Sequence, residues 1–117
     1  MDLNAVFAYI RHEETNICNF LADVVNYVNQ SDVTIFNSGS IWADEILTEG
    51  MLSKKDIMKL IPLTDPMVKF KGKGWSIHLL LENGVSKVPN LEGRFPVISG
   101  IRFKYDSTKE PMERIDP

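Results

Sequence analysis

The sequence predicts an α+β fold with mixed α/β layers, in which three helices pack on a mixed sheet. Helix-like and strand-like patterns alternate along the chain, and the segments are too short and uneven for a regular doubly wound sheet. A length of 117 residues is enough for one domain with a modest core. With 44% hydrophobic and 25% charged residues, the composition is that of a folded globular protein. We therefore expect a single domain over residues 1–117.

The first predicted helix begins at Asn16, with Thr15 or Asn16 as its N-cap. Its apolar residues recur at i, i+3, i+4, i+7 and i+11, which is the spacing of one helical face. These residues are Ile17, Phe20, Leu21, Val24 and Val28.

A run of β-branched and aromatic residues follows at 32–37, "DVTIFN", and stops at "SGS". This pattern predicts a buried strand that ends in a turn, and the turn needs Gly39. A strand that ends in Asn37 and continues with small residues can present an amide and bare backbone N–H groups to a ligand. A tight turn without a ligand is the alternative interpretation.

The second predicted helix runs from Ser53 to Ile61. Ser53 and Asp56 have the spacing of a capping box, and Pro62 disfavours helical geometry in the residue before it. Its apolar face is expected to consist of Ile57, Met58 and Leu60.

Residues 67–73, "MVKFKGK", alternate so that three lysines share one face, which predicts an edge strand protected by charge. A third helix is expected from Trp75 to Glu82, with Gly84 at the position of a C-terminal cap. The lysines could instead bind a polyanion, but a charged strand edge is the simpler interpretation.

A junction rich in Pro and Gly then leads into a final strand, predicted from Val97 to Tyr105 because apolar and charged residues alternate there. Gly84 and Pro89 are expected to end the helix and turn the chain, and Phe95 to anchor the junction in the core. We expect Arg94 to be structural and not to touch a substrate.

The charge and cysteine content restrict the possible partners. A net charge of −3 and a pI near 5.3 give no overall attraction to nucleic acid or to anionic membranes, so neither is expected as a partner. The single cysteine, Cys18, excludes a disulfide within the chain, and no apolar stretch approaches the ~20 residues that span a bilayer. If Met1 is the native start, we expect a cytoplasmic location.

The residues on their own predict no catalytic or metal site. His12 lies beside Glu13 and Glu14, but side chains of neighbouring residues do not converge on one point. Cys18 has no activating neighbour and is expected to be inert and partly buried. "GKGWS" lacks the spacing of a phosphate-binding loop.

Four motifs nevertheless resemble, in order, the C-terminal domain of the 5'-nucleotidase family. They are "NICNFLAD" at 16–23, "FNSGSIWAD" at 36–44, "LIPLTDPMV" at 60–68 and "LLENGVSKVPNLEGRFPVISGIRFKYD" at 80–106. The last motif is long and specific, and the resemblance extends from about residue 11 to residue 115. The resemblance implies the fold of that domain.

The resemblance also implies a division of labour. In the family, an N-terminal metallophosphatase domain holds two metal ions, and the C-terminal domain recognises the nucleoside part of a nucleotide. No metal or other cofactor is expected in this chain, since divalent metals belong to the accompanying metallophosphatase domain. The family's last segment, Gly-Gly-Asp-Gly-Phe/Tyr, carries a stacking aromatic, and the sequence reaches Pro117 without it. One wall of the family's pocket is therefore expected to be missing.

The substrate-binding residues implied by the resemblance lie in three places. Arg11 matches an arginine that faces the substrate, and Asn37 matches the asparagine of the family's Asn-Gly-Gly-x-Ile-Arg loop. Two positions differ, because Trp42 replaces the arginine of that loop and Leu63 replaces a stacking phenylalanine. The full predicted set is Arg11, Asn37, Ser38, Gly39, Ser40, Trp42 and Leu63.

Two functions follow as hypotheses. The first is a nucleotide- or nucleoside-recognition domain of a 5'-nucleotidase-like phosphomonoesterase in nucleotide catabolism, non-catalytic on its own. Its partners would be a nucleoside 5'-monophosphate or nucleoside, bound weakly or no longer bound, and a metallophosphatase domain. The alternative is a family member that has lost its ligand and serves as a structural or protein-interaction module.

Overall fold

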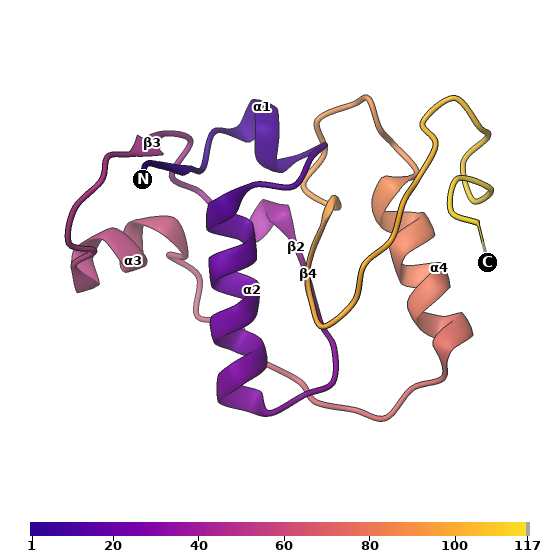
Figure 1. Cartoon of the computed structure of the whole chain (residues 1–117), viewed down its shortest axis with the longest axis horizontal. Helices are drawn as coiled ribbons and strands as arrows, with labels where there is room; N and C mark the ends of the chain where they lie inside the picture. The colour runs from indigo at the N-terminus through magenta and orange to yellow at the C-terminus, as the bar shows by residue number, and fades with distance from the viewer. Residues whose placement is uncertain (117) are drawn as a thin grey trace.

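A computed structural model describes residues 1–116, which form helices and short strands in an α+β arrangement (Figure 1). In chain order the elements are β1 (Leu3–Asn4), α1 (Phe7–Ile10), α2 (Asn16–Asn29), β2 (Thr34–Asn37), the 3-10 helix η1 (Ser38–Ser40), β3 (Ile46–Leu47), α3 (Lys54–Leu60), α4 (Gly74–Val85) and β4 (Pro96–Ser99). The predicted fold class is confirmed, and α2, α3 and α4 are the three predicted helices.

The strands differ from the predicted mixed sheet. Among residues 1–116 they form two separate antiparallel pairs, β1 with β3 and β2 with β4. In the second pair, Thr34 lies opposite Ser99 and Asn37 lies opposite Pro96. The junction before β4 turns the chain so that β4 runs back along β2, which makes the pairing antiparallel.

The β2–β4 pair lies between α2 and α4 (Figure 1). Successive side chains of a strand point to opposite faces, and the two neighbouring residues Val97 and Ile98 accordingly contact different groups of apolar residues. The first cluster lies on the α2 side and consists of Ala5, Ile10, Ile17, Cys18, Leu21, Ala22, Ile41, Leu60 and Val97. The second cluster lies on the α4 side and consists of Leu81, Val85, Val88, Phe95 and Ile115.

Helix α2 begins at the predicted residue, with Thr15 as its N-cap, but its buried face is rotated from the predicted stripe. Ile17 and Leu21 are buried as predicted, together with Cys18 and Ala22. Three predicted core residues are exposed instead: Phe20, Val24 and Val28. The stripe prediction was wrong for these three because the small residues beside Ile17 and Leu21 allow β4 to approach α2 closely.

Helix α3 has the predicted capping box. The Asp56 amide donates to Ser53 Oγ at 3.3 Å, and the Ser53 amide donates to Asp56 Oδ2 at 2.8 Å. Leu60 is fully buried in the first cluster and Ile57 packs against it, whereas Met58 is exposed and does not belong to the apolar face.

Helix α4 extends further than predicted and includes Gly84, so the expectation of a glycine cap was wrong. A Cβ atom on Gly84 would lie 2.9 Å from Cδ of Pro96. Gly84 therefore allows the helix to pack against the start of β4. The predicted burial of Phe95 in the core is confirmed.

Residues 67–73 do not form the predicted edge strand. No partner strand lies beside them within residues 1–116, and the stretch is exposed. Lys69 instead donates from Nζ to the carbonyls of Asn29 and Gln30, at 2.9 and 2.8 Å. Lysine at this place satisfies the last carbonyls of α2.

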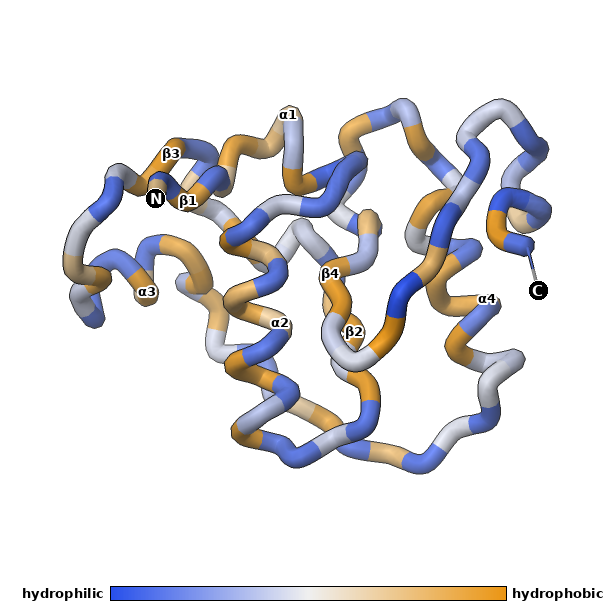
Figure 2. The backbone as a smooth tube through the Cα atoms, in the orientation of Figure 1, coloured by the Kyte–Doolittle hydropathy of each residue, from blue (hydrophilic) through white to orange (hydrophobic). Residues whose placement is uncertain are grey.

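The last predicted strand is shorter than expected, since the β2–β4 ladder ends at Ser99. Gly100 has a φ of 83° and turns the chain away. Hydrophobic and hydrophilic residues alternate in the segment beyond it (Figure 2), but residues 101–105 have no strand partner among residues 1–116. The helices of the described part are all too short or too polar to cross a membrane.

Candidate functional site

The loop after β2 is fixed to the junction before β4 by backbone contacts. The amide of Ser38 donates to the carbonyl of Phe95 at 2.9 Å, and the amide of Gly39 donates to the carbonyl of Gly93 at 2.8 Å. The two glycines touch, because a Cβ on Gly93 would lie 2.8 Å from Cα of Gly39. This close approach makes η1 a rigid support for the side chains around it.

Within this loop, the predicted site residues have different environments. Asn37 is exposed, and its Oδ1 accepts a hydrogen bond from Ser40 Oγ at 3.2 Å. Ser38 is fully buried, with its Oγ 3.5 Å from the Gly93 carbonyl. Asn37 and Ser40 can therefore meet a ligand, whereas Ser38 holds the loop in place.

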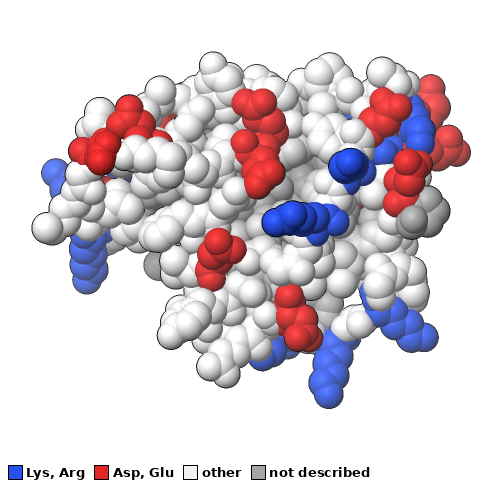
Figure 3. Space-filling model, viewed as in Figure 1, with Lys and Arg blue, Asp and Glu red and all other residues white. Residues whose placement is uncertain are grey.

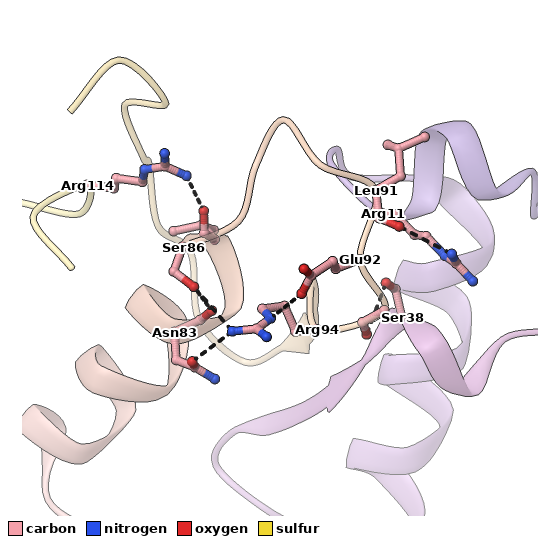
Figure 4. A network of polar contacts seen from close by, with 10 residues as sticks. Arg11, Ser38, Asn83, Ser86, Leu91, Glu92, Arg94 and Arg114 are labelled. Carbon is pink, nitrogen blue, oxygen red and sulfur yellow. Dashed lines mark hydrogen bonds and ion pairs between the residues drawn. The ribbon is translucent and has the colours of Figure 1, made fainter. Parts of the chain in front are cut away.

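Beside η1 lies a hollow of about 250 Å³ that is lined by Phe7, Arg11, Gly39 and Trp42. Arg11 follows α1 directly, and its guanidinium carbon lies 4.2 Å from the centre of the Phe7 ring. Its Nη1 donates to the carbonyl of Leu91 at 3.2 Å (Figure 4). Its Nε is buried and has no hydrogen-bond partner in residues 1–116. The hollow is thus lined by a positioned cation.

Trp42 supplies an aromatic surface to the same hollow. Its indole N–H donates to the carbonyl of Gly39 at 2.9 Å, and its backbone amide donates to the carbonyl of Leu60 at 2.9 Å. These bonds fix Trp42 although the residue is 55% exposed. A fixed and exposed ring can stack on a planar ligand.

The structure brings three of the seven predicted residues together around the hollow: Arg11, Gly39 and Trp42. Leu63 is partly exposed and does not line it. Phe7 lines the hollow but was missed by the sequence reasoning. Its position four residues before Arg11, close enough for a contact between the ring and the guanidinium group, was the one signal that could have revealed it.

A larger hollow of about 350 Å³ is formed by residues 45–52 and Asp56. Its acidic groups already have partners: Glu45 pairs with Lys59 at 2.6 Å, Glu49 pairs with the amino group of Met1 at 2.6 Å, and Asp56 belongs to the capping box. The smaller hollow is the better ligand site because its cation, Arg11, forms no ion pair within residues 1–116.

Other polar residues that the sequence drew attention to are structural. Arg94 turns toward α4 and contacts Glu92, Asn83 and Ser86 (Figure 4), at 2.7, 3.3 and 3.5 Å. Cys18 is buried, and burial raises the pKa of its thiol, which disfavours the reactive thiolate.

His12 contributes its carbonyl to a hydrogen bond from the Tyr105 hydroxyl at 2.7 Å. Nowhere in residues 1–116 do three or more His, Cys, Asp or Glu side chains form a group that could hold a metal ion. The residues present therefore do not fit a dinuclear metal centre.

Comparison with known proteins gives a consistent result. The sequence model of the family described as "5'-nucleotidase, C-terminal domain" matches residues 3–117. The trifunctional nucleotide phosphoesterase protein YfkN of Bacillus subtilis (strain 168) is 27% identical over 111 residues, which cover 92% of this chain and 8% of that protein. The snake venom 5'-nucleotidase of Macrovipera lebetinus is 24% identical over 125 residues, which cover 97% of this chain and 31% of the relative.

Among solved structures, a 5'-nucleotidase precursor from Thermus thermophilus superimposes with a TM-score of 0.81 and 25% sequence identity. The match covers 98% of this chain and 23% of that one. The chain thus spans less than a third of the length of each of these relatives. The match to the family over nearly its whole length shows that the chain belongs to the 5'-nucleotidase C-terminal domain family.

Proposed function

We propose that this chain recognises the nucleoside part of a nucleotide, in the hollow between α1 and η1, for a 5'-nucleotidase-like phosphomonoesterase. The observation that carries the proposal is the pair of Arg11 and Trp42 around one hollow, a cation without an ion pair within residues 1–116 beside an exposed aromatic residue. A ribose oxygen or an acceptor of the base would accept a hydrogen bond from the guanidinium group of Arg11.

The aromatic residues support a planar ligand over a bare phosphate. Trp42 has an exposed ring whose N–H group is already bonded, so the ring face is the part that remains available. Stacking of a base on an aromatic side chain contributes about 1–3 kcal/mol. We infer that Trp42 takes the stacking role that Leu63 cannot perform.

We further propose that hydrolysis takes place in a separate metallophosphatase domain, so that this chain contributes specificity and not catalysis. The relatives it matches are named as nucleotidases and a phosphoesterase, and it covers less than a third of each. Divalent metal ions bound in that other domain would activate the attacking water.

Calorimetric titration with adenosine and with AMP tests the proposal. We expect Arg11→Ala to weaken binding about tenfold or more, because a hydrogen bond to a charged group is lost. Arg94→Ala is the matched control, since Arg94 faces α4, and it should bind within about twofold of the native chain. Absence of binding at millimolar ligand, or equal losses in both variants, would contradict the proposal.

The alternative role as a protein-interaction module has one specific observation in its favour. Helix α2 exposes four large apolar residues on one side: Phe20, Val24, Tyr27 and Val28. Sedimentation of the native chain and of a Tyr27→Ser/Val28→Ser variant tests it. Association that the variant abolishes would favour this role, and identical monomers would count against it.

A further inference from the structure

The two sides of the hollow come from parts of the chain that are distant in sequence and share one support. Arg11 follows α1, whereas Gly39 belongs to η1 and Trp42 comes shortly after it. The support is the stretch before β4, residues 91–95, which we call the junction segment. Figure 4 shows it running from Leu91, beside Arg11, toward the start of η1. Acidic and basic side chains are both scattered over the molecular face in Figure 3, so the surface as a whole does not define a site.

A chain of hydrogen bonds leads from Arg11 to Trp42 through the junction segment. Arg11 Nη1 donates to the carbonyl of Leu91 at 3.2 Å. Two residues further along, the carbonyl of Gly93 accepts from the amide of Gly39 at 2.8 Å. The carbonyl of Gly39 in turn accepts from the Trp42 indole N–H at 2.9 Å. The cation and the aromatic ring are therefore attached to the same short segment.

The junction segment is itself fixed at its C-terminal end. Phe95 is buried in the second cluster, and its carbonyl accepts from the amide of Ser38 at 2.9 Å. The next residue, Pro96, begins β4 and lies opposite Asn37 of β2. The segment therefore has a defined position relative to the core and to the first residue of η1.

Gly93 makes the closest contact between the junction segment and η1. A Cβ on Gly93 would lie 2.8 Å from Cα and 3.3 Å from the backbone nitrogen of Gly39. Non-bonded carbon atoms prefer separations of about 3.5–4.0 Å, and backbone atoms cannot rotate away as a side chain can. Any side chain at position 93 would therefore push η1 away from the junction segment, although Gly93 itself does not line the hollow.

Arg11 has a second support that does not involve the junction segment. Its guanidinium carbon lies 4.2 Å from the centre of the Phe7 ring, and Phe7 packs against the first cluster. A cation held over an aromatic ring is attracted to it electrostatically. A displacement of η1 would therefore change the spacing between Arg11 and Trp42 and would not move the two together.

We propose that Gly93 is a positioning residue of the hollow. Because it has no side chain, the junction segment lies against η1 and sets the spacing between the Arg11 guanidinium group and the Trp42 ring. A nucleoside that stacks on the ring and accepts a hydrogen bond from the cation depends on this spacing. The inference rests on the proposed function, since the ligand is the one proposed there.

NMR of the ligand-free chain tests the positioning role without any ligand. In Gly93→Ala, the Trp42 indole N–H signal should shift because its acceptor on Gly39 is displaced, while the Trp75 signal stays constant. Gly50→Ala is the matched control, since a Cβ there would meet only the Thr48 carbonyl, at 3.9 Å, and both signals should stay as in the native chain. An unchanged Trp42 signal in folded Gly93→Ala would overturn the proposal.

A second variant covers the case in which Gly93→Ala does not fold. Gly39→Ala produces the same contact from the other side, because its Cβ would lie 3.0 Å from Cα of Gly93. The same shift of the Trp42 signal is expected, and its absence in the folded variant would count equally against the proposal.

Calorimetric titration with adenosine then tests the effect on binding. Gly93→Ala should weaken binding about tenfold and Gly50→Ala by less than about twofold. In an Arg11→Ala background the spacing no longer matters, so Gly93→Ala should weaken binding by less than about twofold further. Equal losses in both backgrounds would overturn the proposal. A native chain that binds no adenosine would contradict the proposed function, and the ligand-free Trp42 signal would still decide the role of Gly93.

Discussion

The two apolar clusters on either side of the β2–β4 pair are stabilised by different kinds of interaction. The first cluster contains only apolar side chains and Cys18, contributed by helices, strands and loops from both halves of the chain. The second cluster is smaller, and buried polar groups surround it. Glu82, only 1% exposed, accepts from the Ile115 amide, and Arg114 donates to the carbonyls of Val85 and Val88.

The difference shows two ways to stabilise a small domain. The first cluster gains stability from the burial of apolar area. This contribution has no preferred direction, so small displacements of the side chains change it little. The second depends on directional bonds that attach residues 114–115 to α4, and the loss of either partner leaves a buried polar group unpaired.

The largest effect is expected from a cavity in the first cluster. Ile17→Ala should lower the free energy of unfolding by about 3 kcal/mol, because Ile17 is fully buried. The control is Phe20→Ala on the exposed side of the same helix, with an expected loss below about 1 kcal/mol. Urea unfolding measures both, and equal losses would mean that the burial pattern of α2 is wrong.

In the second cluster, the free energy of unfolding should depend on a polar group and not on an apolar one. Arg114→Met keeps an aliphatic side chain but leaves the carbonyls of Val85 and Val88 unpaired, which should cost about 2 kcal/mol. Arg102→Met, at an exposed arginine, should change stability by less than about 0.5 kcal/mol. If Arg114→Met is as stable as the native chain by urea unfolding, polar bonds do not hold the second cluster.

A smaller effect is expected at the capping box of α3, which reaches the first cluster only through Leu60 and Ile57. Ser53→Ala should lower the free energy of unfolding by about 1 kcal/mol, typical for the loss of an N-cap.

The hydrogen bonds from Ser53 lower the pKa of Asp56 below its usual value. This stabilisation is present above the pKa of Asp56 in the unfolded chain and is lost as pH falls through the folded-state pKa. Thermal melts across this range should show a weaker acid dependence in Ser53→Ala than in the native chain.

The smallest effect concerns Cys18, a natural reporter of the first cluster. Burial raises the pKa of its thiol, so the folded state favours the protonated form. Stability should therefore fall slightly as pH rises from the usual thiol pKa toward the raised one.

Labelling of Cys18 with a thiol reagent requires opening of the first cluster. It should be accelerated more by Ile17→Ala than by Arg114→Met, and the reverse order would mean that the clusters do not open separately.

The sequence correctly predicted the structural features that depend on local signals. The start of α2 and the capping box of α3 are determined by residues within one or two turns, and both were predicted correctly. The strands at 67–73 and 101–105 were predicted from alternation alone, but a strand also requires a partner that supplies hydrogen bonds. Alternation does not reveal whether that partner exists. The polar bonds of Glu82 and Arg114 join residues far apart in sequence and gave no local pattern.

The candidate site was predicted in part for a similar reason. Arg11, Gly39 and Trp42 came from motif resemblance, and the fold places them around one hollow. Leu63 lies outside the hollow because the chain beyond α3 runs over the surface. Phe7 was missed because α1 has only four residues, too few for a periodic pattern.

The central claim, that a nucleoside binds beside Arg11 and Trp42, can be tested most directly by NMR. The chain has two tryptophans, and Trp75 is 63% exposed on α4, outside the hollow, so its indole N–H signal is an internal control. During titration with adenosine, we predict saturable shifts of the Trp42 indole and Arg11 Nε–H signals while the Trp75 signal stays constant. Shifts of equal size at both tryptophans, or no shift at Arg11 at millimolar adenosine, would contradict the claim.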